Sequence, residues 1–145
     1  GVEFAQDGLL NMVGNKVAVV CCNSEEAKLF TDKKQVKAAA RALLEYCQTA
    51  VVTDGADGAT IAHKADDTSE IEIYEVATPV VTNVIDTNGA GDNYAGAFLY
   101  ALSQHYGLLE CGRLASEVAA QVIQQFGPRL ASQDYRDIAQ RVLPA

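Results

Sequence analysis

The stretch that decides the fold runs from residue 84 to residue 99 and reads VIDTNGAGDNYAGAFL. It begins as an extended apolar segment, continues through a loop of small residues and ends as an amphipathic helix. Gly89, Ala90 and Gly91 allow a ligand to approach the backbone closely. The first N–H groups of the helix point into this loop, where the helix dipole adds about half a positive charge. The stretch therefore predicts a site for an oxyanion or phosphate without a lysine, beside the ionised carboxylate of Asp92.

Other loop motifs fit this stretch less well. A P-loop requires Gly-Lys-Ser/Thr, and the stretch contains no lysine. A dinucleotide-binding fingerprint would place its third glycine at Tyr94, and an EF-hand counted from Asp86 would place Ala97 where its bidentate carboxylate belongs. One simpler alternative stays open, in which Asp92 only caps the helix and the glycines of the loop at 86–92 only turn the chain.

Segments with strand and helix character alternate along the rest of the chain, which predicts an α/β domain. The expected strands are apolar or alternating runs, at 17–22, 50–53, 59–63, 70–73 and 80–85. The expected helices have apolar residues at three- and four-residue steps or a capping residue, at 3–13, from Asn23 or Ser24 to Phe30, at 33–47, at 95–107, from Leu114 to about 127, and at 132–142.

The composition excludes several classes of protein. The 145 residues carry a net charge of −8, which argues against a protein that grips the phosphate backbone of nucleic acid. The four cysteines form no Cys-x-x-Cys pair and His63 and His105 lack metal-ligand spacing, so we expect buried free thiols in a reducing compartment. No apolar run approaches the roughly 18 residues needed to span a bilayer. These observations predict a cytoplasmic protein with neither membrane nor nucleic acid as partner.

Residues 86–92, DTNGAGD, followed by GAFL at 96–99, resemble the C-terminal signature of the pfkB/ribokinase family of carbohydrate and nucleoside kinases. The resemblance implies a ribokinase-like three-layer α/β/α fold, with residues 1–145 as its C-terminal nucleotide-binding and catalytic portion. It also implies that Asp92 is the catalytic base and that the amides of Gly89, Ala90, Gly91 and Asp92 form the anion hole for the transferred phosphoryl group. The expected activity is ATP-dependent phosphorylation of a hydroxyl group of a sugar or nucleoside.

Two upstream elements agree with this resemblance in the expected order. Residues 23–26, NSEE, resemble the family's Asn-x-x-Glu element, which implies that Asn23 and Glu26 organise Mg²⁺ and phosphate, largely through water. By itself this element is equally well explained as a helix cap. Residues 53–58, TDGADG, resemble the family's Thr-x-Gly-x-x-Gly nucleotide turn, which implies a role for its three matching residues, Thr53, Gly55 and Gly58. By itself this element is a hairpin turn.

Weaker matches lie in the loop and downstream of it. Ser116, with Ala119 and Ala120, matches the segment that flanks adenine in the family, although helix packing explains small residues there equally well. Asp86 and the Asn88 carbonyl match the position where family members hold a monovalent cation such as K⁺, and a structural brace is the alternative for Asp86. The stretch QFGPRL at 125–130 favours the adenosine-kinase-like branch.

The chain departs from the family pattern in one respect. The N-terminal signature, the residues that orient the sugar and the small β lid have no counterpart within residues 1–145. Half of such a sheet would expose strand edges, so the expected partners are the missing N-terminal half or a second copy in a homo-oligomer, besides the small-molecule substrate. The alternative function is a nucleotide-binding fragment without kinase activity of its own.

Overall fold

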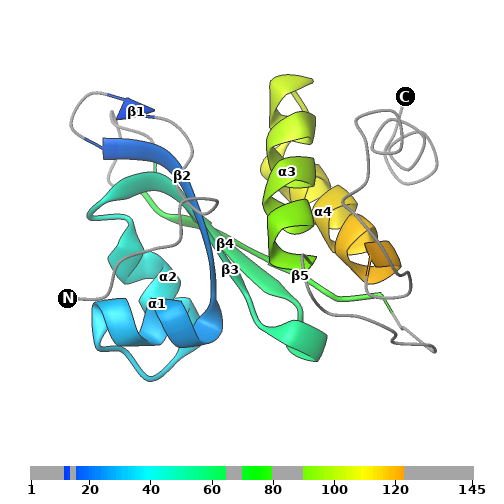
Figure 1. Cartoon of the computed structure of the whole chain (residues 1–145). Helices are drawn as coiled ribbons and strands as arrows, with labels where there is room; N and C mark the ends of the chain where they lie inside the picture. The colour runs from blue at the N-terminus through cyan, green and yellow to red at the C-terminus, as the bar shows by residue number, and fades with distance from the viewer. Residues whose placement is uncertain (1–11, 14–15, 65–69, 80–89, 123–145) are drawn as a thin grey trace. The chain divides into compact units, whose positions relative to one another are not determined.

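The computed structural model describes residues 12–13, 16–64, 70–79 and 90–122 of the chain (Figure 1). Contacts divide the chain into two compact units, which meet between Glu75 and Val76 in the sequence. Each unit is described below by itself. No helix in these described ranges combines the length and the apolar character that a bilayer-crossing helix needs.

The first unit contains a five-stranded mixed sheet in the order β1-β2-β3-β4-β5. Its strands are β1 (Met12–Val13), β2 (Lys16–Asn23), β3 (Cys47–Thr53), β4 (Ala59–His63) and β5 (Glu72–Val76). Strands β2 and β3 run parallel, whereas β1 is antiparallel to β2 and β4 is antiparallel to β3. The parallel pair β2 and β3 and the hairpin of β3 with β4 agree with the strands expected at 17–22, 50–53 and 59–63.

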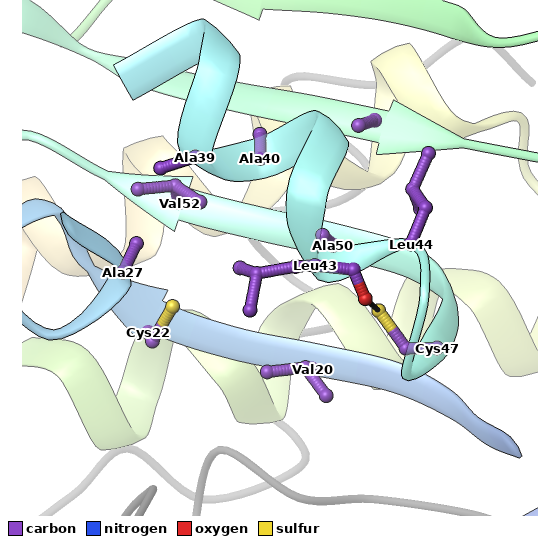
Figure 2. Close-up of a cluster of buried hydrophobic side chains, with 11 residues drawn as sticks. Val20, Cys22, Ala27, Ala39, Ala40, Leu43, Leu44, Cys47, Ala50 and Val52 are labelled. Carbon is purple, nitrogen blue, oxygen red and sulfur yellow. Dashed lines mark hydrogen bonds between the residues drawn. The ribbon is translucent and has the colours of Figure 1, made fainter. Parts of the chain in front are cut away.

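Helices α1 (Ser24–Thr31) and α2 (Val36–Leu43) connect the parallel strands β2 and β3 and pack against the sheet. Figure 2 shows the core that they share with the sheet, in which Leu43 points toward Val20 and Cys22 of β2. Apolar side chains from five elements and the turn before β3 form this core: Val20, Cys22, Ala27, Ala39, Ala40, Leu43, Leu44, Cys47, Ala50, Val52 and Ala62. The small residues of α2 allow its backbone to lie close to the sheet.

The central strands are buried on both faces, as the continuous apolar runs predict. Val19 and Cys21 are buried like Val20 and Cys22, although successive side chains of a strand point to opposite faces. On β3, Val51 and Val52 are both fully buried. The buried residues therefore lead directly to the carboxyl ends of these two strands, where the candidate site lies.

Several predicted boundaries in the first unit were wrong, among them the start of the strand expected at 50–53, which begins at Cys47. The helix expected at 33–47 is confined to Val36–Leu43, because residues 44–46 form a turn and Cys47 begins β3. In the sequence, Cys47 continues the three- and four-residue spacing of the apolar residues of α2. In the structure it lies on β3 and packs into the core that α2 shares with the sheet. The helix expected at 3–13 does not extend to Met12–Val13, which pair with β2 as a strand, and its residues 3–11 lie outside the described ranges. Strand β5 begins at Glu72 rather than at residue 70.

The second unit contains helices α3 (Ala90–Ser103) and α4 (Leu108–Val122), which pack against each other. Phe98 and Leu114 are fully buried, in agreement with the apolar spacing. Helix α3 ends at Ser103, earlier than expected, because His105 adopts a left-handed conformation with φ 67°. The N–H of Tyr106 then donates to the carbonyl of Ala101 at 3.2 Å, a Schellman-type ending.

Several predicted elements lie outside the described residues. These are the extended segment at 80–85, most of the loop at 86–92, the continuation of α4 toward residue 127, the helix at 132–142 and the branch-specific stretch at 125–130.

Candidate active site

The carboxyl ends of β2 and β3 lie at the same edge of the sheet (Figure 1). Strand β2 ends at Asn23 and β3 ends at Thr53, and these two residues are partners in the parallel register. In open α/β sheets, ligands bind beyond the carboxyl ends of parallel strands. The structure thus brings the Asn-x-x-Glu element and the glycine turn, which are 30 residues apart in sequence, to one edge.

Asn23 caps helix α1 through a complete capping box. Its side-chain oxygen accepts a hydrogen bond from the N–H of Glu26 at 2.8 Å, and its own N–H donates to Oε1 of Glu26 at 3.0 Å. Of the two expected caps, Asn23 is therefore the one that is used, and Ser24 is the first helical residue. Such a box fixes the rotamer of the glutamate as well as the start of the helix. The carboxylate of Glu26 is held back toward the strand end.

The turn between β3 and β4 closes on itself. The N–H of Asp54 donates to the Gly58 carbonyl at 2.7 Å, that of Asp57 to the Asp54 carbonyl at 3.0 Å, and that of Gly58 to the Gly55 carbonyl at 3.1 Å. Residues Gly55–Asp57 form a short 3₁₀ turn within it. Three N–H groups of the turn are therefore used in hydrogen bonds within the turn.

Both glycines of the turn have positive φ, as the motif requires. Gly55 has φ 55°, and Gly58 has φ 96° with ψ −149°, a conformation that is essentially restricted to glycine. A Cβ atom added to Gly55 would meet no atom within 4 Å. The backbone at Gly55 therefore faces open space, which is the condition for the close approach of a flat or anionic ligand.

Thr53 precedes this turn and contacts the neighbouring strand. Its hydroxyl group donates a hydrogen bond to the main-chain carbonyl of Cys22 at 3.4 Å. The motif predicts that Thr53 contributes to nucleotide binding, but the sequence contains no signal for this main-chain partner. A carbonyl has no side-chain signature, so only the register of β2 and β3 could reveal the contact.

The predicted phosphate loop is described only where it becomes helix. Helix α3 begins at Ala90, so Ala90, Gly91 and Asp92 form its first turn. The predicted loop boundary at residue 92 was therefore wrong, because the helix already begins at Ala90 and extends through Gly91 despite the low helix propensity of glycine. Asp86, Asn88 and Gly89 lie outside the described residues.

Ser116 is buried in helix α4 of the second unit, with 5% of its surface exposed. Ala120 is buried on the same helix, whereas Ala119 is half-buried. This burial agrees with small residues selected for helix packing, and it does not distinguish that explanation from a place beside a base. The contribution of Ser116 to a nucleotide site stays a prediction.

The cysteine side chains are buried, as predicted, and none of the four forms a disulfide. Burial raises the pKa of Cys21 to about 12 and, reinforced by the neighbouring carboxylate of Glu26, raises the pKa of Cys22 to about 12. Thiols with such a pKa are poor nucleophiles and poor metal ligands at neutral pH. Within the described ranges no group of three His, Cys, Asp or Glu side chains could hold a metal ion.

Comparison with known proteins identifies the same family as the motifs at the ends of β2 and β3. Residues 2–134 match the family described as pfkB family carbohydrate kinase. An uncharacterised sugar kinase of Archaeoglobus fulgidus is 31% identical over 131 residues, covering 89% of this chain and 50% of the relative. The chain thus spans about half the length of this curated relative.

Solved structures of kinases share the fold. A probable sugar kinase from Rhizobium etli is 33% identical with a TM-score of 0.74, and the match covers 86% of this chain and 36% of that protein. An adenosine kinase from Sinorhizobium meliloti is 32% identical with a TM-score of 0.72, over the same shares of the two chains. The predicted α/β fold of ribokinase type is confirmed, and the chain belongs to the pfkB family of carbohydrate kinases.

Proposed function

We propose that this chain supplies the nucleotide-binding and catalytic portion of an ATP-dependent kinase that phosphorylates a hydroxyl group of a sugar or nucleoside. The observation that carries the proposal is the register pairing of Asn23 with Thr53, which gathers two family elements at one sheet edge. Family membership and the similarity to sugar and adenosine kinases support the same reaction class. Because the chain spans about half of its curated relative, the acceptor-binding residues are proposed to belong to the remaining half of the family's length.

The nucleotide is proposed to lie against the turn that follows β3. Gly55 leaves the backbone bare where it faces open space, Gly58 allows the backbone conformation that ends the turn, and the Thr53 hydroxyl contacts the neighbouring strand where the turn begins. The turn uses much of its own hydrogen-bonding capacity, so it would contact the nucleotide by shape rather than by charge. Ser116 of α4 is proposed to flank the base, where a small side chain leaves room for a flat ring.

The residues at this edge fit a nucleotide-bound Mg²⁺. Magnesium keeps several water ligands and is held by one or two carboxylates together with substrate phosphates, rather than by an all-protein cage. Glu26 supplies one such carboxylate, with one oxygen on the Asn23 N–H and capacity for further hydrogen bonds from water. When bound, the metal supplies positive charge that offsets the negative charge on the phosphoryl oxygens.

Asp92 is proposed to be the general base. Its carboxylate accepts the proton of the acceptor hydroxyl while that oxygen forms a bond to the γ-phosphorus of ATP. The bond from the γ-phosphorus to the β–γ bridging oxygen breaks, and ADP leaves with that electron pair. The first N–H groups of a helix have no partner within it, so those of Gly89, Ala90, Gly91 and Asp92 are proposed to hold the transferred group.

A monovalent cation such as K⁺ is proposed to be held by Asp86 and the carbonyl of Asn88. Oxygen donors of this kind suit a hard cation, and a bound cation would brace the loop before Asp92.

The reaction is tested by incubating the chain with ATP, Mg²⁺ and a panel of sugars and nucleosides and measuring ADP. ADP formation that depends on one acceptor supports the kinase. ATP binding without ADP favours the second candidate, a nucleotide-binding fragment, which the partial coverage of the relatives supports. Absence of both ATP binding and ADP contradicts the proposal. With an active preparation, Asp92→Asn is expected to lower kcat by about 10²–10⁴-fold while ATP still binds.

A further inference from the structure

One peptide group connects the two elements at the sheet edge. The carbonyl of the Cys22–Asn23 peptide accepts a hydrogen bond from the Thr53 hydroxyl at 3.4 Å. The N–H of the same peptide donates to Oε1 of Glu26 at 3.0 Å. The hydroxyl that begins the glycine turn and the carboxylate of Glu26 therefore lie at opposite ends of a single hydrogen-bonded chain.

The side chain of Asn23 takes part in the same arrangement. Its oxygen accepts from the N–H of Glu26 at 2.8 Å, so the main chain of the glutamate is fixed as well as its carboxylate. The next residue, Ala27, is fully buried against the sheet and anchors the first turn of α1. Asn23 on β2 thus contacts Glu26 directly, and Thr53 on the paired strand β3 contacts the other end of the same peptide group.

We infer that Asn23 and Thr53 are positioning residues that hold the carboxylate of Glu26 for Mg²⁺, through the peptide between Cys22 and Asn23. This inference rests on the proposed function, in which Glu26 serves the nucleotide-bound metal. Hydrogen bonds in a chain polarise one another, and a carboxylate that is already oriented loses little freedom when it engages a ligand. The resemblance implies that Asn23 organises Mg²⁺ and phosphate, largely through water, and that Thr53 belongs to the nucleotide turn. The contacts assign both residues a role that acts through Glu26, and the alternative is that they contact the nucleotide directly.

The two roles differ in how they depend on Mg²⁺. A residue that contacts the nucleotide directly contributes to ATP affinity with or without the metal. A residue that acts through Glu26 contributes only to the gain in affinity that Mg²⁺ produces. The Mg²⁺-dependent gain is the dissociation constant of ATP measured in EDTA divided by that measured in Mg²⁺. This ratio therefore distinguishes a direct role from a role through Glu26.

The test uses two matched pairs of variants of the 145-residue chain, with calorimetric titration of ATP in Mg²⁺ and in EDTA. Thr53→Val removes the hydroxyl at nearly constant shape and Thr53→Ser keeps it; Asn23→Ala removes the cap and Asn23→Ser keeps an acceptor. We expect the Mg²⁺-dependent gain to fall on the order of 10-fold in Thr53→Val and Asn23→Ala. Removal of a residue that orients a metal ligand weakens metal binding by about this factor. The two serine variants should retain most of the gain. Equal losses in Mg²⁺ and in EDTA would overturn the inference.

A control in the same helix excludes a general effect of helix stability. Lys28→Gly weakens α1 by an amount comparable to the loss of a cap, at a position outside the capping box. We expect its melting temperature to fall as much as that of Asn23→Ala, with the Mg²⁺-dependent gain unchanged. A loss of the gain in Lys28→Gly as large as in Asn23→Ala would overturn the positioning role.

Hydrogen exchange tests the arrangement without any ligand. The Asn23 amide should be protected in the wild-type chain and in Glu26→Gln, which keeps an acceptor oxygen, and should exchange faster in Glu26→Ala. An unprotected Asn23 amide in the wild type contradicts the inference even where ATP binds normally. A protected amide in a chain that binds no ATP in Mg²⁺ identifies the proposed function itself as wrong, and the inference falls with it.

Discussion

Asn23 and Thr53 are register partners at the carboxyl ends of the parallel strands β2 and β3. Each is followed at once by a structure that exposes backbone, a capped helix after Asn23 and a glycine turn after Thr53. The residues that precede them in the two strands are buried, so both residues are attached to regular elements of the core. Residues on rigid elements hold a ligand more precisely than residues on long loops do.

Gly58→Ala should destabilise the chain by about 1–3 kcal/mol, because φ 96° with ψ −149° is strained for any residue with a Cβ atom. The free energy of unfolding from urea titration measures this loss. Gly55→Asn is the matched control, since asparagine tolerates the left-handed conformation at φ 55°. Gly55→Asn should lower the free energy of unfolding by less than about 1 kcal/mol. Equal losses for the two variants would contradict the backbone conformation of the turn at Gly58.

Leu43→Ala should lower the free energy of unfolding by about 2–5 kcal/mol, because the Leu43 side chain is fully buried between α2 and the sheet (Figure 2). Leu29→Ala on α1 makes the same chemical change at a side chain that is 69% exposed, and should cost less than about 0.5 kcal/mol. Urea unfolding of the two variants under identical conditions gives the comparison. Equal free energies of unfolding for Leu43→Ala and Leu29→Ala would contradict the burial of Leu43 in the core.

Stability should fall as the pH rises from 9 toward 12. Burial raises the pKa of Cys21 and Cys22 from 9.0 to about 12, so in this range the unfolded chain releases thiol protons that the folded chain retains. The free energy of unfolding therefore decreases with increasing pH, and the contribution of these thiols is fully present below pH 9. Urea unfolding at pH 8, 9 and 10 measures the slope.

The thiols can be separated from the other groups that titrate in this range by substitution. Cys21→Ala and Cys22→Ala should each show a shallower decrease with pH than the wild type. At pH 8 the native thiols should react with a disulfide reagent only as fast as the chain opens, because little thiolate is present in the folded state. Rapid labelling of Cys21 or Cys22 in the native chain would contradict their burial.

Much of the fold could be predicted from local pattern. Continuous apolar runs identify β2 and β3, because strands buried on both faces need no polar alternation. Asn23 before two glutamates identifies the start of α1 through the chemistry of capping. The boundaries of α2 could not be predicted, since Leu44 and Cys47 keep helical spacing although they reach the core from a turn and a strand.

The candidate site was predicted as separate motifs rather than as an arrangement. The motifs place Asn23 and Glu26 at the start of a helix and Thr53 at the end of a strand, as the structure has them, but the register that joins them depends on pairing between strands 30 residues apart. The contact of Thr53 with a main-chain carbonyl depends on the same register. Sequence pattern does not encode such contacts, because every residue carries the same carbonyl group.

The affinity of the 145-residue chain for ATP, compared between the wild type and Gly55→Asn, tests the central claim most directly. The asparagine fits the backbone conformation of Gly55, and its side chain enters the open space where the nucleotide is proposed to lie. Calorimetric titration in Mg²⁺ should show saturable binding to the wild type and a dissociation constant raised at least about 10-fold in the variant, a difference of 1.4 kcal/mol or more. Equal affinities, or a folded wild-type chain that binds no ATP, would contradict the nucleotide site at this edge of the sheet.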